Sequence, residues 1–176
     1  MKKTKLISFF IVLVFVFLIA SSGTSSAASN DFRFTKSKSI PFRYNTVVSW
    51  FDTRVTGGAV SPVRYRAYFD GSASARWYGT NPYLLHEIQY NNSFRMTGLG
   101  GLSVSKSGPS VSISGATASY GRTGKDVRSM ITNYSLGFQR INICWVSQSF
   151  STTYVARISG TEVDTTFNIS DDRVFW

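Results

Sequence analysis

The sequence is poor in the residue types that build most catalytic and metal sites. It holds one cysteine, Cys144, and one histidine, His86, so it offers neither an intramolecular disulfide nor a cysteine–histidine zinc ligand set. A dyad of these two residues has the right chemistry for nucleophilic catalysis. However, Cys144 lies in the apolar run Ile141–Val146, where a cysteine behaves as a small buried hydrophobe. We therefore predict no catalytic residue, no cofactor and no metal site.

Long apolar runs are also missing, except for one near the N-terminus. Met1–Lys5 is basic, Leu6–Ala20 is almost wholly apolar, and small polar residues follow. This order is typical of a secretory signal peptide, and the run is shorter than the roughly 20 residues that span a bilayer. We predict cleavage after Ala28 and a secreted mature chain, extracellular or cell-wall associated, without a transmembrane helix.

The mature chain, residues 29–176, is long enough for one domain with its own apolar core. We expect a flexible basic arm over residues 29–39 and a single β-sandwich domain over residues 40–176. Secretion without disulfides favours a bacterial source.

Acidic residues are scarce. The chain has 19 Lys and Arg against 9 Asp and Glu, and removing Lys2, Lys3 and Lys5 with the signal peptide lowers the formal net charge from +10 to +7. A basic secreted protein is attracted to anionic cell-wall polymers, glycans and anionic membrane surfaces. The same positive charge also keeps a protein soluble. It therefore indicates the class of partner but does not locate a binding site.

Most of the chain alternates apolar and polar residues with period two, and turn residues interrupt the pattern every 8–12 residues or so. This pattern predicts an all-β fold, a single antiparallel β-sandwich of roughly eight to ten strands. One segment differs, because Val127, Met130, Ile131 and Tyr134 are spaced as on one face of a helix. We therefore also expect one short helix over residues 126–134.

The stretch VRYRAYFDGSASARWYG, residues 63–79, predicts a hairpin around Asp70-Gly71. A three-residue loop over residues 70–72 places Phe69 opposite Ala73 and Tyr65 opposite Trp77, so that one face is apolar throughout. Burial favours this odd-length loop, because a one-residue slip would mix apolar and charged side chains on both faces. The hairpin also sets Arg66 directly across from Arg76, and opposed like charges are destabilising unless an anion lies between them.

The polar face of this hairpin is the candidate binding site, a platform for a phosphate- or carboxylate-bearing polymer or glycan. Guanidinium groups bind such anions through paired hydrogen bonds, and tyrosine rings offer flat amphipathic surfaces. The residues are Arg64, Arg66, Arg76, Tyr68 and Tyr78. The alternative is a solvated sheet face whose charges prevent aggregation.

A second hairpin is predicted over residues 101–114, with Val104 facing Val111 and serines on the other side. Amphipathic hairpins of this kind are inserted by pore-forming toxins, although each arm has only about five residues and membrane strands need roughly 9–11. The leading hypothesis is a small secreted, non-enzymatic binding or surface protein, with hydrolase activity not excluded. The alternative is a secreted membrane-active toxin or bacteriocin-like antimicrobial protein.

Overall fold

The structure is a computed structural model that describes residues 29–43, 45–61, 63–79, 85–108, 110–114 and 116–175, and only the backbone of residues 85, 100–102 and 144. The signal peptide predicted for residues 1–28 and the side chain of Cys144 lie outside this description. The strands are β1 (Ser29–Phe42), β2 (Asn45–Ala59), β3 (Arg64–Tyr78), β4 (Leu85–Ser107), β5 (Ser112–Ser114), β6 (Thr117–Lys125), β7 (Ser129–Ile158) and β8 (Thr161–Val174).

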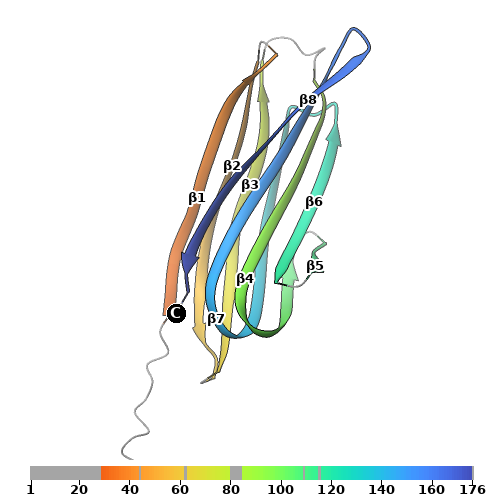
Figure 1. Ribbon diagram of the computed structural model, residues 1–176. Helices are drawn as coiled ribbons and strands as arrows, with labels where there is room; N and C mark the ends of the chain where they lie inside the picture. Colours follow the sequence, from red (N-terminus) through yellow and green to blue (C-terminus); the bar gives the residue numbers. More distant parts are fainter. Residues whose placement is uncertain are drawn as a thin grey trace, which may run out of the picture.

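These strands pair antiparallel in one sheet of order β1-β2-β3-β7-β4-β6-β5, with β8 on β7 (Figure 1). Strand β7 has three neighbours because its halves separate: residues 129–141 pair with β3 and residues 145–158 with β8. Strand β4 divides likewise, since residues 85–97 pair with the second half of β7 and residues 99–107 with the first. The sheet therefore folds back on itself into two layers.

One layer, called here the β1–β3 layer, holds β1, β2, β3, the first half of β7 and the end of β4. The opposite layer, called here the β6–β8 layer, holds β8, the second half of β7, the start of β4, β6 and β5. The chain changes layers at two corners near the lower end in Figure 1. In β4 the register shifts on both sides of Leu99, and in β7 Asn142 has a φ of 47°. Bulges and bends of this kind carry strands between the layers of a sandwich.

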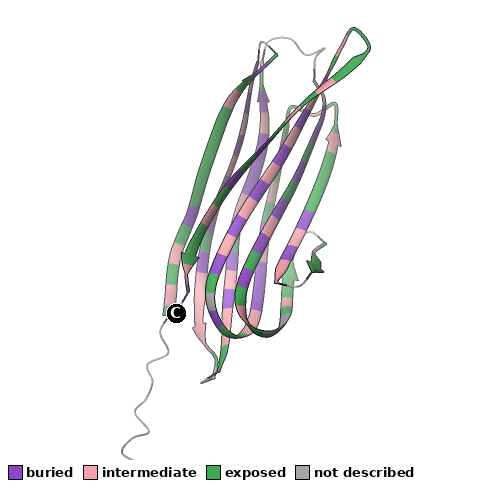
Figure 2. Cartoon of the chain, in the orientation of Figure 1, coloured by how far each residue is buried: buried purple, intermediate pink, exposed green. Residues whose placement is uncertain are grey.

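The core lies between the layers and is rich in aromatic side chains. Buried and more exposed residues alternate along β2, β3 and the second half of β7 (Figure 2). Phe69 of β3 meets Phe94 of β4 with ring centroids 5.1 Å apart and Phe138 of β7 at 5.3 Å. The predicted all-β, antiparallel fold is confirmed.

The predicted helix over residues 126–134 is wrong. Asp126 has a φ of 54°, and β7 begins at Ser129. Met130 and Tyr134 are buried while Ile131 is 48% exposed, and residues four apart share a face in a strand as well as in a helix. Pairing with β3 therefore decides in favour of the strand. None of the described residues forms a helix that could cross a membrane.

The predicted hairpin over residues 63–79 is also wrong, because β3 runs without a turn through Asp70-Gly71 and pairs with β2 and β7 along its length. Its face assignment is nevertheless correct. Ala67, Phe69 and Trp77 are buried, and a three-residue loop leaves the alternation unchanged. At Gly71 the strand leaves no room for a side chain, because an added Cβ would lie 2.2 Å from the carbonyl oxygen of Asp52. The glycine therefore serves close packing within the sheet and not a turn.

The second predicted hairpin, over residues 101–114, does not form either. Val104 lies opposite Phe138 of β7, whereas Ile113 in β5 lies opposite Ala118 of β6. The two arms therefore pair with different strands. A serine-rich alternating stretch fits any half-exposed strand, so the local pattern did not distinguish between these partners.

Residues 29–39, expected to be a loose basic arm, form most of β1 and pair with β2 throughout. The reason lies in two aromatic residues within the polar stretch. Phe34 is fully buried, and its ring lies 5.4 Å from that of Phe32. The burial of these rings holds the strand against the core, while its lysines and arginine remain in solvent.

Buried polar side chains join the two layers. The Gln148 amide, fully buried in the second half of β7, accepts a hydrogen bond from Thr53 Oγ1 at 2.6 Å and donates to Tyr134 Oη at 2.8 Å and to Asn92 Oδ1 at 3.1 Å. Nearby, Tyr154 Oη donates to the Val48 carbonyl at 2.7 Å. Each of these groups would cost several kcal/mol if buried without a partner.

The Tyr154→Phe variant tests this cross-layer contact. Tyr154 Oη also accepts from the Arg76 backbone N–H at 3.1 Å, so the variant leaves two backbone groups without this partner. We expect a loss of about 1–3 kcal/mol in the free energy of unfolding. The measurement is urea denaturation at pH 7, with Tyr78→Phe as control because the Tyr78 side chain is half exposed; equal losses in both variants would contradict the assignment.

The same hydroxyl predicts a pH dependence. Burial raises the pKa of Tyr154 to about 12, above the value of about 10 for an unfolded tyrosine. A raised folded-state pKa gives stability that is complete below pH ~10 and is lost as the pH rises toward ~12. The stability difference between wild type and Tyr154→Phe should therefore shrink in urea titrations from pH 8 to pH 11. A stability difference that stays constant over this pH range would show that Tyr154 ionises as readily in the folded state as in the unfolded state.

Candidate functional site

The candidate site is built around Arg66 and Tyr68 on the outer face of β3. These two side chains point the same way because they are two residues apart on a strand. Arg66 Nη1 donates to Tyr68 Oη at 3.1 Å, and Nη2 donates to Gln139 Oε1 of β7 at 3.3 Å. The guanidinium is thus oriented along the sheet surface by two neutral partners.

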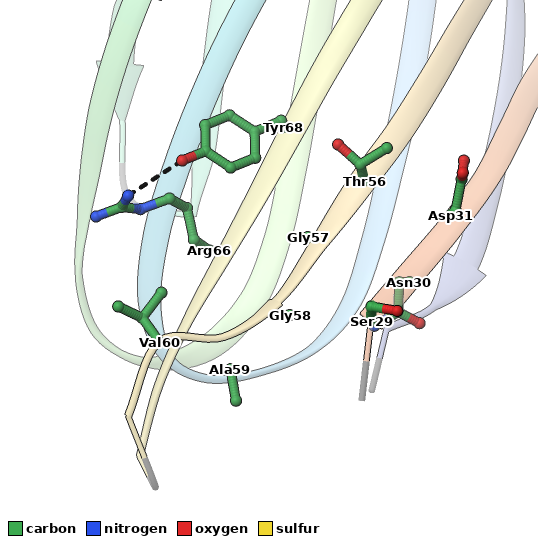
Figure 3. Close-up of a pocket in the computed structure, with 10 residues that line it drawn as sticks. All are labelled: Ser29, Asn30, Asp31, Thr56, Gly57, Gly58, Ala59, Val60, Arg66 and Tyr68. Atoms are coloured by element: carbon green, nitrogen blue, oxygen red, sulfur yellow. Dashed lines mark hydrogen bonds between the residues drawn. The ribbon is translucent and has the colours of Figure 1, made fainter. Parts of the chain in front are cut away.

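Two hollows adjoin this pair, and Arg66 and Tyr68 line both of them. The first has a volume of about 510 Å³ (Figure 3) and is also lined by Ser29, Asn30, Asp31, Thr56, Gly57, Gly58, Ala59 and Val60. The second has a volume of about 370 Å³ and is also lined by Ser103, Val104, Ser105, Gly137, Phe138 and Gln139. We call the two hollows together the Arg66 site.

Glycines keep the floor of this site low. Gly57 has a φ of 146°, and an added Cβ would lie 2.0 Å from the Arg66 carbonyl oxygen. At Gly137 an added Cβ would lie 2.5 Å from Ser105 Oγ and 3.1 Å from Tyr68 Cε1. Because Gly137 has no side chain, the tyrosine ring lies close over β7, and because Gly57 has none, β2 passes close to the backbone of β3 beside Arg66.

The electrostatics of the site are positive. Its acidic residue, Asp31, is held by Arg54, whose Nε and Nη2 donate to the two carboxylate oxygens at 3.0 and 2.6 Å. This hydrogen bonding lowers the pKa of the Asp31 carboxyl. Among the described residues, no carboxylate forms an ion pair with Arg66. A guanidinium has five N–H donors, so Arg66 retains donors that a ligand can use.

The structure does not bring all the predicted site residues together. Arg64 is exposed at the start of β3, next to the Arg66 site. Arg76 lies at the opposite end of the same strand, roughly 33 Å from Arg66 at 3.3 Å per residue, and Tyr78 lies two residues further along. The predicted pairing of Arg66 with Arg76 is therefore wrong. Arg76 repeats the local arrangement, since its Nη1 donates to Tyr78 Oη at 3.4 Å.

Several residues of the site were not found from the sequence. Gln139, Ser103 and Ser105 come from β7 and β4, and they reach Arg66 and Tyr68 because Gln139 aligns with Arg66 and Ser105 with Gly137. Asp31 comes from the segment expected to be a loose arm. These residues carry no local signal, because a polar residue on an outer sheet face is ordinary and only the strand order shows its neighbours.

The one histidine lies far from this site. At the other end of the sandwich, His86 Nε2 lies 3.1 Å from Glu162 Oε1, which also accepts from Arg157 Nη2 at 2.8 Å. The arginine lowers the pKa of Glu162. Within the described part of the chain, no three His, Cys, Asp or Glu side chains form a group that could hold a metal ion.

Comparisons with known proteins give no family for this chain. No protein-family model matches it, and no curated protein matches it. Among solved structures it is similar to the GAE domain of GGA2p from Saccharomyces cerevisiae, with 12% identity over 77% of this chain and 96% of that chain and a TM-score of 0.23. It is also similar to collagen adhesin (CNA) from S. aureus, with 7% identity over 86% and 82% of the two chains and a TM-score of 0.21. TM-scores this low indicate neither a shared fold nor a function.

The close approach at Gly57 can be tested by substitution. Gly57→Ala combines a left-handed backbone with a clash against β3, whereas Gly160→Ala, with a φ of 83°, meets nothing within 4 Å. We expect Gly160→Ala to cost about 1 kcal/mol of unfolding free energy and Gly57→Ala at least about 2 kcal/mol. Thermal and urea unfolding of both variants give the comparison; equal effects would show that β2 does not pass this close to Arg66.

Proposed function

We propose that this protein is a secreted, non-enzymatic binding protein that holds an anionic cell-wall polymer or glycan at the Arg66 site. The observation that supports this most directly is the state of Arg66. Its side chain is oriented by Tyr68 and Gln139, but its charge is not matched by a carboxylate among the described residues. A phosphate or carboxylate group supplies the missing negative charge and two acceptor oxygens.

The chemistry of the lining residues favours binding over catalysis. Besides Arg66 and Tyr68, the second hollow offers the hydroxyls of Ser103 and Ser105 and the amide of Gln139. Such groups suit the hydroxyls and anionic groups of a glycan. The acid of the first hollow, Asp31, is already engaged by Arg54 and therefore makes a poor general base.

The overall charge supports the same class of partner. The mature chain carries a formal net charge of +7, which raises the rate of encounter with anionic surfaces. Charge alone acts over a Debye length of roughly 10 Å at 0.1 M salt and weakens as salt rises. Arg66 is partly buried, and the contacts of a partly buried charge are screened less by salt than those of fully exposed charges.

The test is co-sedimentation of the mature chain, residues 29–176, with isolated bacterial cell walls at about 50 and about 500 mM salt. We expect binding to persist at high salt and to weaken about tenfold or more in Arg66→Gln, because a charge-assisted hydrogen bond contributes roughly 1.5–3 kcal/mol. Arg66→Lys should also weaken binding, since lysine lacks the planar paired donors of arginine.

The matched control is Arg128→Gln. It removes one positive charge from an exposed position whose backbone carbonyl accepts from Trp77, at the far end of β3. If this control weakens binding as much as Arg66→Gln, the attraction belongs to the diffuse charge and the proposal fails. The alternative function, a membrane-active toxin or bacteriocin-like protein, predicts release of dye trapped in anionic vesicles, which the proposed function does not.

A further inference from the structure

A second surface, apolar and adjoining the Arg66 site at Val60, lies at the lower end of the sandwich in Figure 1. Among the described residues, eight large hydrophobic side chains are exposed, and three of them, Tyr78, Ile113 and Ile131, lie elsewhere. The other five are Val60, Val63, Leu99, Ile141 and Trp145, with exposed fractions of 53%, 51%, 64%, 38% and 40%. We call these five residues the apolar tip.

Strand pairing places these five residues together. Val60 and Val63 belong to the turn between β2 and β3, and the Asn142 N–H donates to the Val63 carbonyl at 3.0 Å, which ties this turn to the corner of β7. Leu99 at the corner of β4 lies opposite Ile141. Trp145 follows the corner of β7, where it lies opposite Thr97. The tip is thus made by one turn and two corners that the fold brings to one end.

Such a concentration is unusual for a soluble surface. Turns and corners are normally polar, and contiguous exposed apolar patches mark interaction sites. In this protein Val60, Val63 and Leu99 lie outside the core, and Trp145 is also exposed at this end. Tryptophan is enriched where an apolar phase meets water, because its ring is amphipathic.

Positive charge borders the tip. Arg64 is exposed and lies opposite Ile141 in the sheet register. Arg95 is exposed and lines a hollow together with Trp145, which Asp171 and Asp172 also line. Among the described residues neither arginine forms an ion pair with a carboxylate. Apolar side chains with arginines next to them match a bilayer that carries anionic headgroups over an apolar interior.

We propose that the apolar tip docks the protein on the surface of an anionic lipid bilayer. Val60, Val63, Leu99, Ile141 and Trp145 enter the interfacial layer, and Arg64 meets the lipid phosphates. A second copy of the chain is the less favourable occupant, because a two-fold contact through this end would bring the arginines of both copies together. The protein docks from one side and does not cross the bilayer.

The test is flotation of the mature chain with vesicles of phosphatidylglycerol and phosphatidylcholine. The Val63→Ser/Leu99→Ser double variant should weaken binding about tenfold or more, since the loss of buried apolar groups reduces interfacial affinity. The matched control, Ile113→Ser/Ile131→Ser, removes two similarly exposed apolar side chains away from the tip and should bind as wild type does. Equal binding by both double variants would overturn the proposal.

Further measurements separate this proposal from its alternatives. Lipids brominated along the acyl chain should quench wild-type tryptophan fluorescence more than that of Trp145→Phe; equal quenching would overturn the placement of Trp145 in the interface. If wild type sediments as a dimer and Val63→Ser/Leu99→Ser as a monomer, the tip binds a second copy and the proposal fails. Val63→Ser/Leu99→Ser changes no residue that lines the Arg66 site. It should therefore retain cell-wall binding while Arg66→Gln retains flotation, so the two proposals can fail separately.

Discussion

The alignment of the two layers depends on one buried amide. Gln148 lies in the middle of an aromatic core with no exposed surface, and its hydrogen bonds reach both layers through Thr53, Tyr134 and Asn92. Apolar contacts between sheets tolerate small shifts, but a buried amide without partners costs several kcal/mol. The amide therefore selects one alignment of β2 against the second half of β7. Within the β1–β3 layer, the position of Arg66 beside Gln139 follows from the register of β3 with the first half of β7.

The fold class and the inner faces of the strands were predictable, because both depend only on a period of two. Along β3 the sequence already separates Ala67, Phe69 and Trp77 from the arginines, and the structure buries those three residues. The same period does not distinguish a strand from a hairpin with a three-residue loop, so Asp70-Gly71 was taken for a turn. The same ambiguity explains the error at residues 126–134. Met130 and Tyr134 lie on one face in a helix as well as in a strand, and pairing with β3 makes this segment a strand.

Only the residues of the candidate site that lie on one strand could be predicted from the sequence. Arg66 and Tyr68 are two residues apart, so the sequence alone shows that they share a face. Gln139 and Ser105 join them through pairing with β7 and β4, and no local pattern encodes that pairing. The apolar tip was missed for the same reason. Val60 and Leu99 stand among small and polar residues in the sequence, whereas Trp145 lies within the apolar run Ile141–Val146. They form a surface only when two strands turn their corners at the same end.

The first and last strands of the described chain also meet each other. Lys36 Nζ of β1 lies 4.0 Å from Asp171 Oδ1 of β8, and Lys38 Nζ lies 5.5 Å from the centre of the Phe167 ring. Closure of the sandwich on this side therefore waits until β8 has been synthesised, and Ser49 must find Thr152 across 103 residues of chain. Contacts this distant slow folding. A chain with this topology therefore completes its sandwich only after its last strand has been made, and until then the inner face of β1 lacks its cover from β8.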